Sequence, residues 1–98
     1  MPLEIGKRYR IKGQIVTIRS SNAQGKKKAA VTAEGRVINF GQEGATVRPG
    51  TEAGNAYCAR SAGIASGARD RLTPNDLARA DWHCVGATSR EDGPSPID

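Results

Sequence analysis

The stretch that decides the fold is AAVTAEGRVINF, which occupies residues 29–40. Short apolar runs flank the pair Glu34-Gly35, and a glycine-containing pair between two such runs is typical of a β-hairpin turn. Pairing the two runs around this turn sets small side chains opposite large ones, so that the strands can interlock against a core. The expected partners are Val31 with Ile38 and Ala29 with Phe40.

An earlier hairpin is predicted between residues 3 and 20, with Lys12-Gly13 as its turn. This register places Tyr9 opposite Val16 and Lys7 opposite Ile18. Because side chains alternate between the two faces of a strand, one face becomes apolar and the other cationic. The apolar face comprises Ile5, Tyr9, Ile11, Val16 and Ile18, and the cationic face comprises Arg8, Arg10, Lys12, Thr17 and Arg19, interrupted by Ile15.

Two interpretations of the cationic face stay open: a solvated side that keeps the hairpin soluble, or a surface that binds an anionic partner. Residues 20–28 lack apolar periodicity and predict an exposed loop that ends in Lys26, Lys27 and Lys28. These lysines are likewise either solvated or in contact with phosphates or carboxylates.

Two short helices are expected in the second half of the chain. Thr51 can cap a helix over about residues 52–62 that ends near Gly63. Thr73, with a proline next and Asp76 at the third helical position, predicts a capped helix to about Ala80. The first helix is expected to present Ala53, Tyr57, Arg60 and Ile64 along one face, and Trp82 is expected to close the second helix as a core anchor.

The sequence therefore predicts an α+β fold, a small and mainly antiparallel β domain with two hairpins, two short helices and extended termini. Its expected parts are a basic hairpin and lysine-rich loop in residues 1–28, a core in residues 29–88 and an extended or disordered tail in residues 89–98. Residues 63–71 are expected to form a loop. A chain of 98 residues with few large apolar side chains buries a thin core, which favours oligomerisation or docking on larger subunits.

Charge is distributed unevenly along the chain. Residues 1–50 hold ten Lys or Arg and three acids, giving +7, whereas residues 51–98 hold five Arg and seven acids, giving −2, which together make the net +5. A basic half can bind nucleic acid, an acidic membrane surface or an acidic protein. No charged and apolar leader and no membrane-length apolar run is present, so we expect a soluble protein made in the cytoplasm without a membrane partner.

No residue pattern predicts catalysis or a cofactor. Cys58, His83 and Cys84 supply soft ligands for zinc, but the set lacks a Cys-x-x-Cys spacing and a fourth ligand other than Asp81. Without a secretory leader, reduced and unreactive thiols are the leading expectation, and a Cys58–Cys84 disulfide is the alternative. Phosphate-binding loops and metalloprotease motifs are missing from the sequence, so an enzyme is not expected.

Nucleic-acid binding stays open as an alternative. A stripe of Arg8, Arg10, Arg19 and Lys26–Lys28 could contact phosphates. Stacking platforms for bases are scarce, because Tyr9 lies on the expected apolar face and Phe40 and Trp82 are expected in the core. Such binding would be indifferent to base sequence.

Three short segments resemble a group of small proteins from tailed phages and giant viruses. They are the run ending in Phe40-Gly41, the segment Tyr57-Cys58-Ala59-Arg60-Ser61, and Thr73-Pro74-Asn75 followed by Arg79, Trp82 and Cys84. The resemblance covers about residues 29–89 and omits the first hairpin. Ser61 stands where many members of the group have histidine, which argues against a metal site.

The resemblance implies a virion component, made in the host cytoplasm and present in many copies or as an oligomer. We expect a capsid-associated cement or decoration protein that docks on other virion proteins, with the major capsid protein as a candidate partner. Neck, tail or baseplate positions are alternatives, as are a non-specific nucleic-acid-binding module and, more remotely, a zinc-dependent regulator. Expected partner contacts are Arg8, Arg10, Lys12, Ile15, Arg19, Lys26, Lys27 and Lys28, and expected structural residues are Phe40, Tyr57, Arg60, Arg79 and Trp82.

Overall fold

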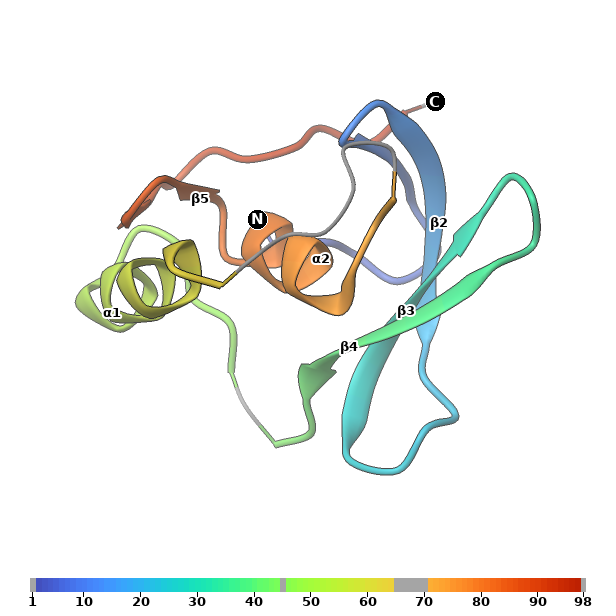
Figure 1. Ribbon diagram of the computed structural model, residues 1–98, viewed down its shortest axis with the longest axis horizontal. Helices are drawn as coiled ribbons and strands as arrows, with labels where there is room; N and C mark the ends of the chain where they lie inside the picture. The colour runs from blue at the N-terminus through green and yellow to red at the C-terminus, as the bar shows by residue number, and fades with distance from the viewer. Residues whose placement is uncertain (1, 45, 65–70, 98) are drawn as a thin grey trace.

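A computed structural model of the chain describes residues 2–44, 46–64 and 71–97, and the α+β class is confirmed (Figure 1). Most of the predicted loop at residues 63–71 lies outside the described residues. None of the described helices is both long and apolar enough to cross a bilayer. The elements are β1 (Arg8–Ile11), β2 (Gln14–Ser20), β3 (Lys26–Thr32), β4 (Val37–Gln42), α1 (Glu52–Ala62), α2 (Pro74–Asp81), β5 (Cys84–Val85) and β6 (Thr88–Ser89).

Strands β1 to β4 form one antiparallel sheet in chain order. The register of the first hairpin is confirmed, since Tyr9 pairs with Val16 and the Ile18 amide donates to the Lys7 carbonyl. The turn residues Lys12 and Gly13 have φ of 54° and 79°. Positive φ at both central positions gives the turn a twist that matches the two strands.

The register of the second hairpin was predicted one residue out. Ala30 pairs with Ile38 and Lys28 pairs with Phe40. The cause is a three-residue loop in place of a two-residue turn: the Gly35 amide donates to the Thr32 carbonyl, and Gly35 has φ of 87°. A glycine in this conformation is typical of three-residue hairpin loops. The shift brings Lys28, instead of Ala29, to the side of the sheet that carries Phe40.

Strand β3 begins at Lys26, so the predicted exposed loop over residues 20–28 is wrong for its last three residues. β2 pairs with β3 across the predicted boundary at residue 28, with Ser20 opposite Lys28. The two hairpins therefore share one continuous sheet. Apolar periodicity did not predict a strand here because the segment begins with three lysines. The strand forms because β3 is hydrogen-bonded to both β2 and β4.

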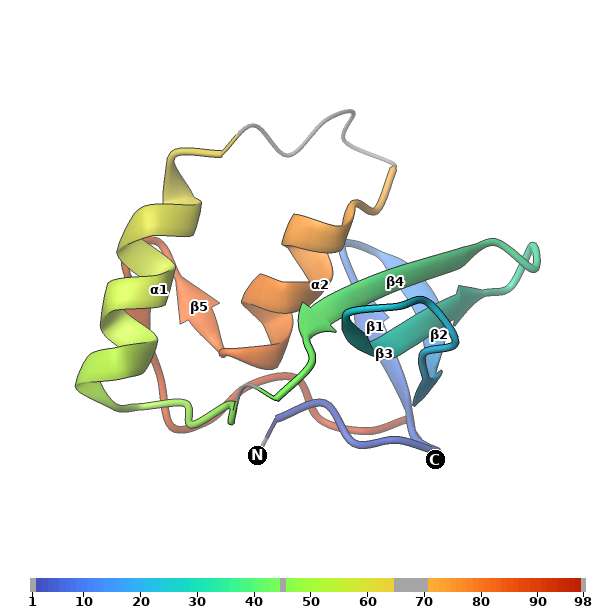
Figure 2. The same ribbon diagram turned by 90° about the horizontal axis from the view of Figure 1, so that it is seen from below.

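The core fills the space between one face of the sheet and α2 (Figures 1 and 2). Ile5 was predicted on the apolar face of the first hairpin, but it precedes β1, is 52% exposed and does not belong to this core. The buried cluster consists of Leu3, Tyr9, Ile11, Val16, Ile18, Ala30, Ile38, Phe40, Leu72 and Leu77.

Helix α1 has the predicted bounds and the predicted cap, since Thr51 Oγ1 accepts from the Gly54 amide. Its buried residues are Gly54, Cys58 and Ser61, none of which belongs to the face that the sequence analysis described. In Figure 2, α2 lies between α1 and the sheet, and β5 runs beside α1. The buried face of α1 is therefore set by β5 and β6, which are too short for an apolar pattern to predict.

Helix α2 begins with the predicted capping box. The Asp76 carboxylate accepts from the Thr73 amide, and Thr73 Oγ1 accepts from the Asp76 amide. The helix runs through Asp81 and ends at Trp82, within a residue of the prediction. The described tail is extended, as predicted, and it lies on the domain: the Ile97 amide donates to the Arg8 carbonyl, beside the edge of β1.

Candidate functional site

One face of the four-stranded sheet points away from the two helices (Figures 1 and 2). Arg8, Arg10 and Arg19 pair with Thr17, Ile15 and Ala29, respectively, and this register places all three arginines on this face. All three are exposed. Ile15 and Val37 lie on the same face, 37% and 43% exposed. None of the four strands contains an Asp or Glu. We call this surface, formed by Arg8, Arg10, Ile15, Arg19, Lys27 and Val37, the outer face.

Three of the predicted partner-contact residues lie elsewhere. Lys12 turns toward α2, where its Nζ is 3.1 Å from Asp76 Oδ2 and 3.0 Å from the Arg71 carbonyl. Lys26 and Lys28 are two residues apart on β3, so both side chains lie on the side of the sheet that faces the helices. Lys26 is exposed at the end of β3, whereas Lys28 is buried.

Lys28 forms the polar centre of the core. Its Nζ lies 2.9 Å from Asp81 Oδ1 and donates to the Leu3 carbonyl at 2.7 Å, and the Leu3 amide donates to the same Asp81 oxygen at 2.8 Å. The two charged side chains are only 8% and 3% exposed. A buried charge of this kind is tolerated because it is paired and hydrogen-bonded. The network joins the N-terminal segment, β3 and α2.

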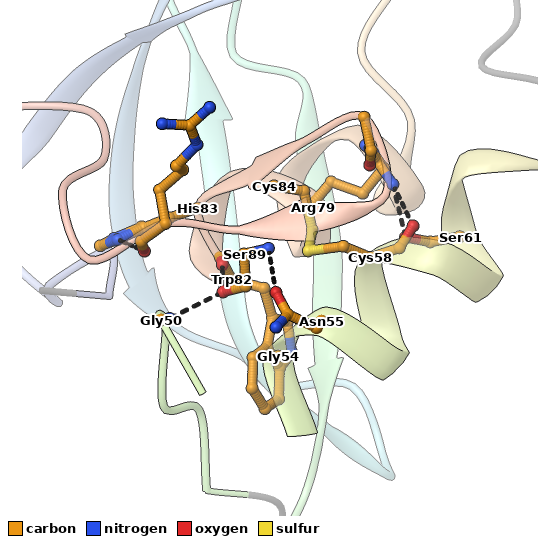
Figure 3. Close-up of a disulfide and its surroundings, with 12 residues drawn as sticks. Gly50, Gly54, Asn55, Cys58, Ser61, Arg79, Trp82, His83, Cys84 and Ser89 are labelled. Carbon is orange, nitrogen blue, oxygen red and sulfur yellow. Dashed lines mark hydrogen bonds between the residues drawn. A yellow bond between two sulfur atoms is a disulfide. The ribbon is translucent and has the colours of Figure 1, made fainter. Parts of the chain in front are cut away.

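Cys58 and Cys84 form a disulfide, so the leading expectation of reduced thiols is wrong. Figure 3 shows the bond between α1 and β5, with the His83 ring directed away from it. His83 Nδ1 lies 3.2 Å and 3.1 Å from the carbonyl oxygens of Arg90 and Glu91, which can only accept, so this nitrogen carries the proton. Cys58, His83 and Cys84 therefore do not assemble as metal ligands. Among the described residues, no three His, Cys, Asp or Glu side chains are grouped to hold a metal ion.

Arg79 ties α2 to α1 and to the turn after β5. Its guanidinium donates to the Cys58 carbonyl at 2.9 Å, to Ser61 Oγ at 2.7 Å and to the Gly86 carbonyl at 2.6 Å (Figure 3). These contacts fix the separation of the two helices beside the disulfide. Ser61 is buried and serves as an acceptor for this arginine.

Gly54 allows α1 to approach β6 closely. A Cβ at this position would lie 2.5 Å from Ser89 Oγ. Ser89 is itself held by three contacts, since its hydroxyl donates to the Trp82 carbonyl, its Oγ accepts from the Gly50 amide, and its amide donates to Asn55 Oδ1 (Figure 3). The glycine that weakens the isolated helix therefore permits its tertiary packing.

A cleft of about 500 Å³ lies between α1, α2 and the adjoining ends of β3 and β4. Tyr57 and Trp82 both line it, with their rings stacked at a centroid distance of 5.5 Å and an interplanar angle of 25°. Both side chains are only partly buried, so Trp82, which was predicted as a core anchor, lies at the edge of the cleft and not within the core. Burial raises the pKa of the Tyr57 phenol, against the lowering effect of the nearby Arg79.

Sequence reasoning missed this cleft as a site. It assigned Tyr57, Arg60 and Trp82 structural roles, and all three line the cleft, together with Lys26. Tyr57 and Arg60 are three residues apart on α1, which places them on one helix face. The sequence analysis recognised this shared face. It could not predict a cleft there, because the position of Trp82 beside Tyr57 depends on how α2 packs against α1.

No protein-family model, curated protein or solved structure matches this chain. Function must therefore be inferred from the outer face and the cleft.

Proposed function

We propose that the chain is a docking protein whose outer face binds an acidic patch on a larger protein. One observation carries the proposal: an uncovered sheet face combines exposed arginines with exposed apolar side chains and has no carboxylate on its strands. Positive charge spread over a broad surface attracts an anionic partner and suppresses self-association.

The apolar side chains favour a protein as the partner over a nucleic-acid backbone. Ile15 pairs with Arg10 across β1 and β2, and Val37 lies at the far end of the same face. Phosphates give such side chains nothing to pack against, whereas protein interfaces combine apolar contacts with arginine, which is enriched in them.

In keeping with the viral resemblance, the proposed setting is a virus particle, with the chain acting as a cement or decoration protein on the capsid. The disulfide supports this setting, because disulfides persist in oxidising surroundings such as those met by a released particle. A neck, tail or baseplate position would use the same outer face.

The test is mass spectrometry of purified particles that carry the wild-type chain or variants. Arg8→Ser/Arg19→Ser removes two charges from the outer face, and Arg48→Ser/Arg90→Ser removes two from exposed positions outside the sheet. We expect many copies of the wild type and of the control, and a marked loss of the outer-face variant. Absence of the wild type would refute the virion setting, and equal incorporation of both variants would refute the role of the outer face.

A further inference from the structure

We propose that the cleft between α1 and α2 binds a nucleotide unit, with the base against the Tyr57–Trp82 pair and the phosphate between Arg60 and Lys26. Lys27 belongs to the outer face and also lines this cleft, but the binding proposed here does not depend on the docking function. The unit could belong to a free nucleotide or to a single strand, and the chemistry of recognition is the same for both.

The aromatic pair supplies the base-binding part. In a domain whose large apolar residues are mostly buried, Tyr57 and Trp82 are both left partly open on the cleft. Base stacking on aromatic side chains is favourable for every base, since each has a flat π-face. Fully buried Phe40 and the small side chains of Ala53 and Ala78 complete an apolar lining. A volume of about 500 Å³ lies in the range of small-molecule sites.

The charges around the cleft select an anionic ligand. Lys26 comes from β3 and Arg60 from α1, both side chains are exposed, and neither forms an ion pair within the described part of the chain. Asp81 also lines the cleft, but its carboxylate is neutralised by Lys28 at 2.9 Å. The cleft therefore has a positive balance, and a guanidinium and an ammonium group suit phosphate oxygens.

The polar groups at the cleft also match a base better than a peptide. Asn75 and Gln42 present amides that can both donate and accept, as the edge of a base requires. An acidic peptide would satisfy the two cations but would leave the aromatic pair without a flat partner unless it also carried a ring. Acidic peptide binding is therefore the competing outcome.

The walls of the cleft are fixed before any ligand binds. The disulfide holds α1 to β5, and Arg79 holds α2 to α1 through the Cys58 carbonyl and Ser61. Preorganised walls reduce the entropy lost on binding. Tyr57 and Trp82 thus keep their stacked arrangement in the free protein.

The test uses Trp82, the only tryptophan of the chain, as its own reporter. Its fluorescence is titrated at low salt with AMP, with a short oligo-dT strand, with inorganic phosphate and with poly-glutamate. We expect saturable quenching by AMP or the oligonucleotide, and none by inorganic phosphate. Tighter binding of the strand than of AMP would identify single-stranded nucleic acid as the ligand, and comparable binding would identify a free nucleotide.

Variants then assign the site. Lys26→Gln/Arg60→Gln changes two exposed side chains and should weaken nucleotide binding by about tenfold or more, because it removes both charged donors proposed to contact the phosphate. For the oligonucleotide, the magnitude of the slope of log K against log salt should fall by about 0.7, the value for one phosphate on a single strand. The control Arg8→Ser/Arg19→Ser should bind as the wild type does. Failure of both nucleotide probes to quench at millimolar concentration, quenching by poly-glutamate alone, or equal losses in the two variants would overturn the proposal.

Discussion

The Cys58–Cys84 disulfide should supply a large share of the stability of this domain. It joins α1 to β5 across 26 residues of sequence. In the chain-entropy treatment, closing a loop of this length lowers the entropy of the unfolded chain enough to stabilise the fold by about 3.5 kcal/mol at room temperature. Domains of this size typically have only about 5–15 kcal/mol in total. Removing the bond should therefore cost a quarter or more of the stability.

The perturbation is the double variant Cys58→Ala/Cys84→Ala, compared with reduced wild-type protein. Urea unfolding, followed by Trp82 fluorescence and by circular dichroism, should show a lower midpoint for both. The corresponding fall in melting temperature is about 17 °C, since a chain of 98 residues has an unfolding entropy of about 0.2 kcal/mol/K. Reduced wild type retains both sulfur atoms, so its difference from the double variant measures the packing that the sulfurs contribute.

Two results bear directly on the reasoning. The double variant should be indifferent to reductant, because it has no other cysteine. If oxidised and reduced wild type unfold at the same urea concentration, the disulfide does not constrain the unfolded chain and the estimate fails. A change in the slope of the transition without a change in its midpoint would also contradict it.

Three further outcomes are expected. Lys28→Met leaves Asp81 buried without its partner and should lower the free energy of unfolding by about 3–5 kcal/mol, whereas Lys28→Met/Asp81→Leu should recover much of this in the same urea experiment. Gly54→Ala should destabilise the fold despite the better helix propensity of alanine, because its Cβ would lie 2.5 Å from Ser89 Oγ, and adding Ser89→Ala should reduce the loss. The raised pKa of Tyr57 means that the unfolded chain releases this phenolic proton first, so stability should fall as pH rises through and above 10, and Tyr57→Phe should abolish that part of the fall.

Local signals predicted the elements they govern. The Lys12-Gly13 turn fixed the register of the first hairpin, and the Thr73 capping box fixed the start of α2. The second hairpin shows the limit, because Glu34-Gly35 indicates a turn without distinguishing a two-residue from a three-residue loop. The one additional loop residue determines on which side of the sheet the Lys28 side chain lies.

Contacts between distant parts of the chain left no local signal. Lys28 and Asp81 are 53 residues apart, and nothing in a run of three lysines marks the middle of a strand or the one lysine that will be buried. The disulfide was kept as an alternative because a particle released from the cell meets oxidising surroundings, and no local feature of the sequence indicated that Cys58 and Cys84 lie close together. The cleft depends on α1 and α2 meeting through Arg79, so its aromatic pair could be predicted only after the packing was known.

The disulfide and the buried ion pair also change the argument for docking. The thin core predicted from the sequence suggested a domain that depends on neighbours for its stability. Small domains commonly compensate for a thin core with covalent links, and the Cys58–Cys84 bond is such a link. The Lys28 network adds a second connection between the N-terminal segment, β3 and α2. The isolated chain should therefore fold, and the case for a docking partner rests on the exposed arginine and apolar side chains of the outer face, where the Arg8→Ser/Arg19→Ser variant can test it without unfolding the domain.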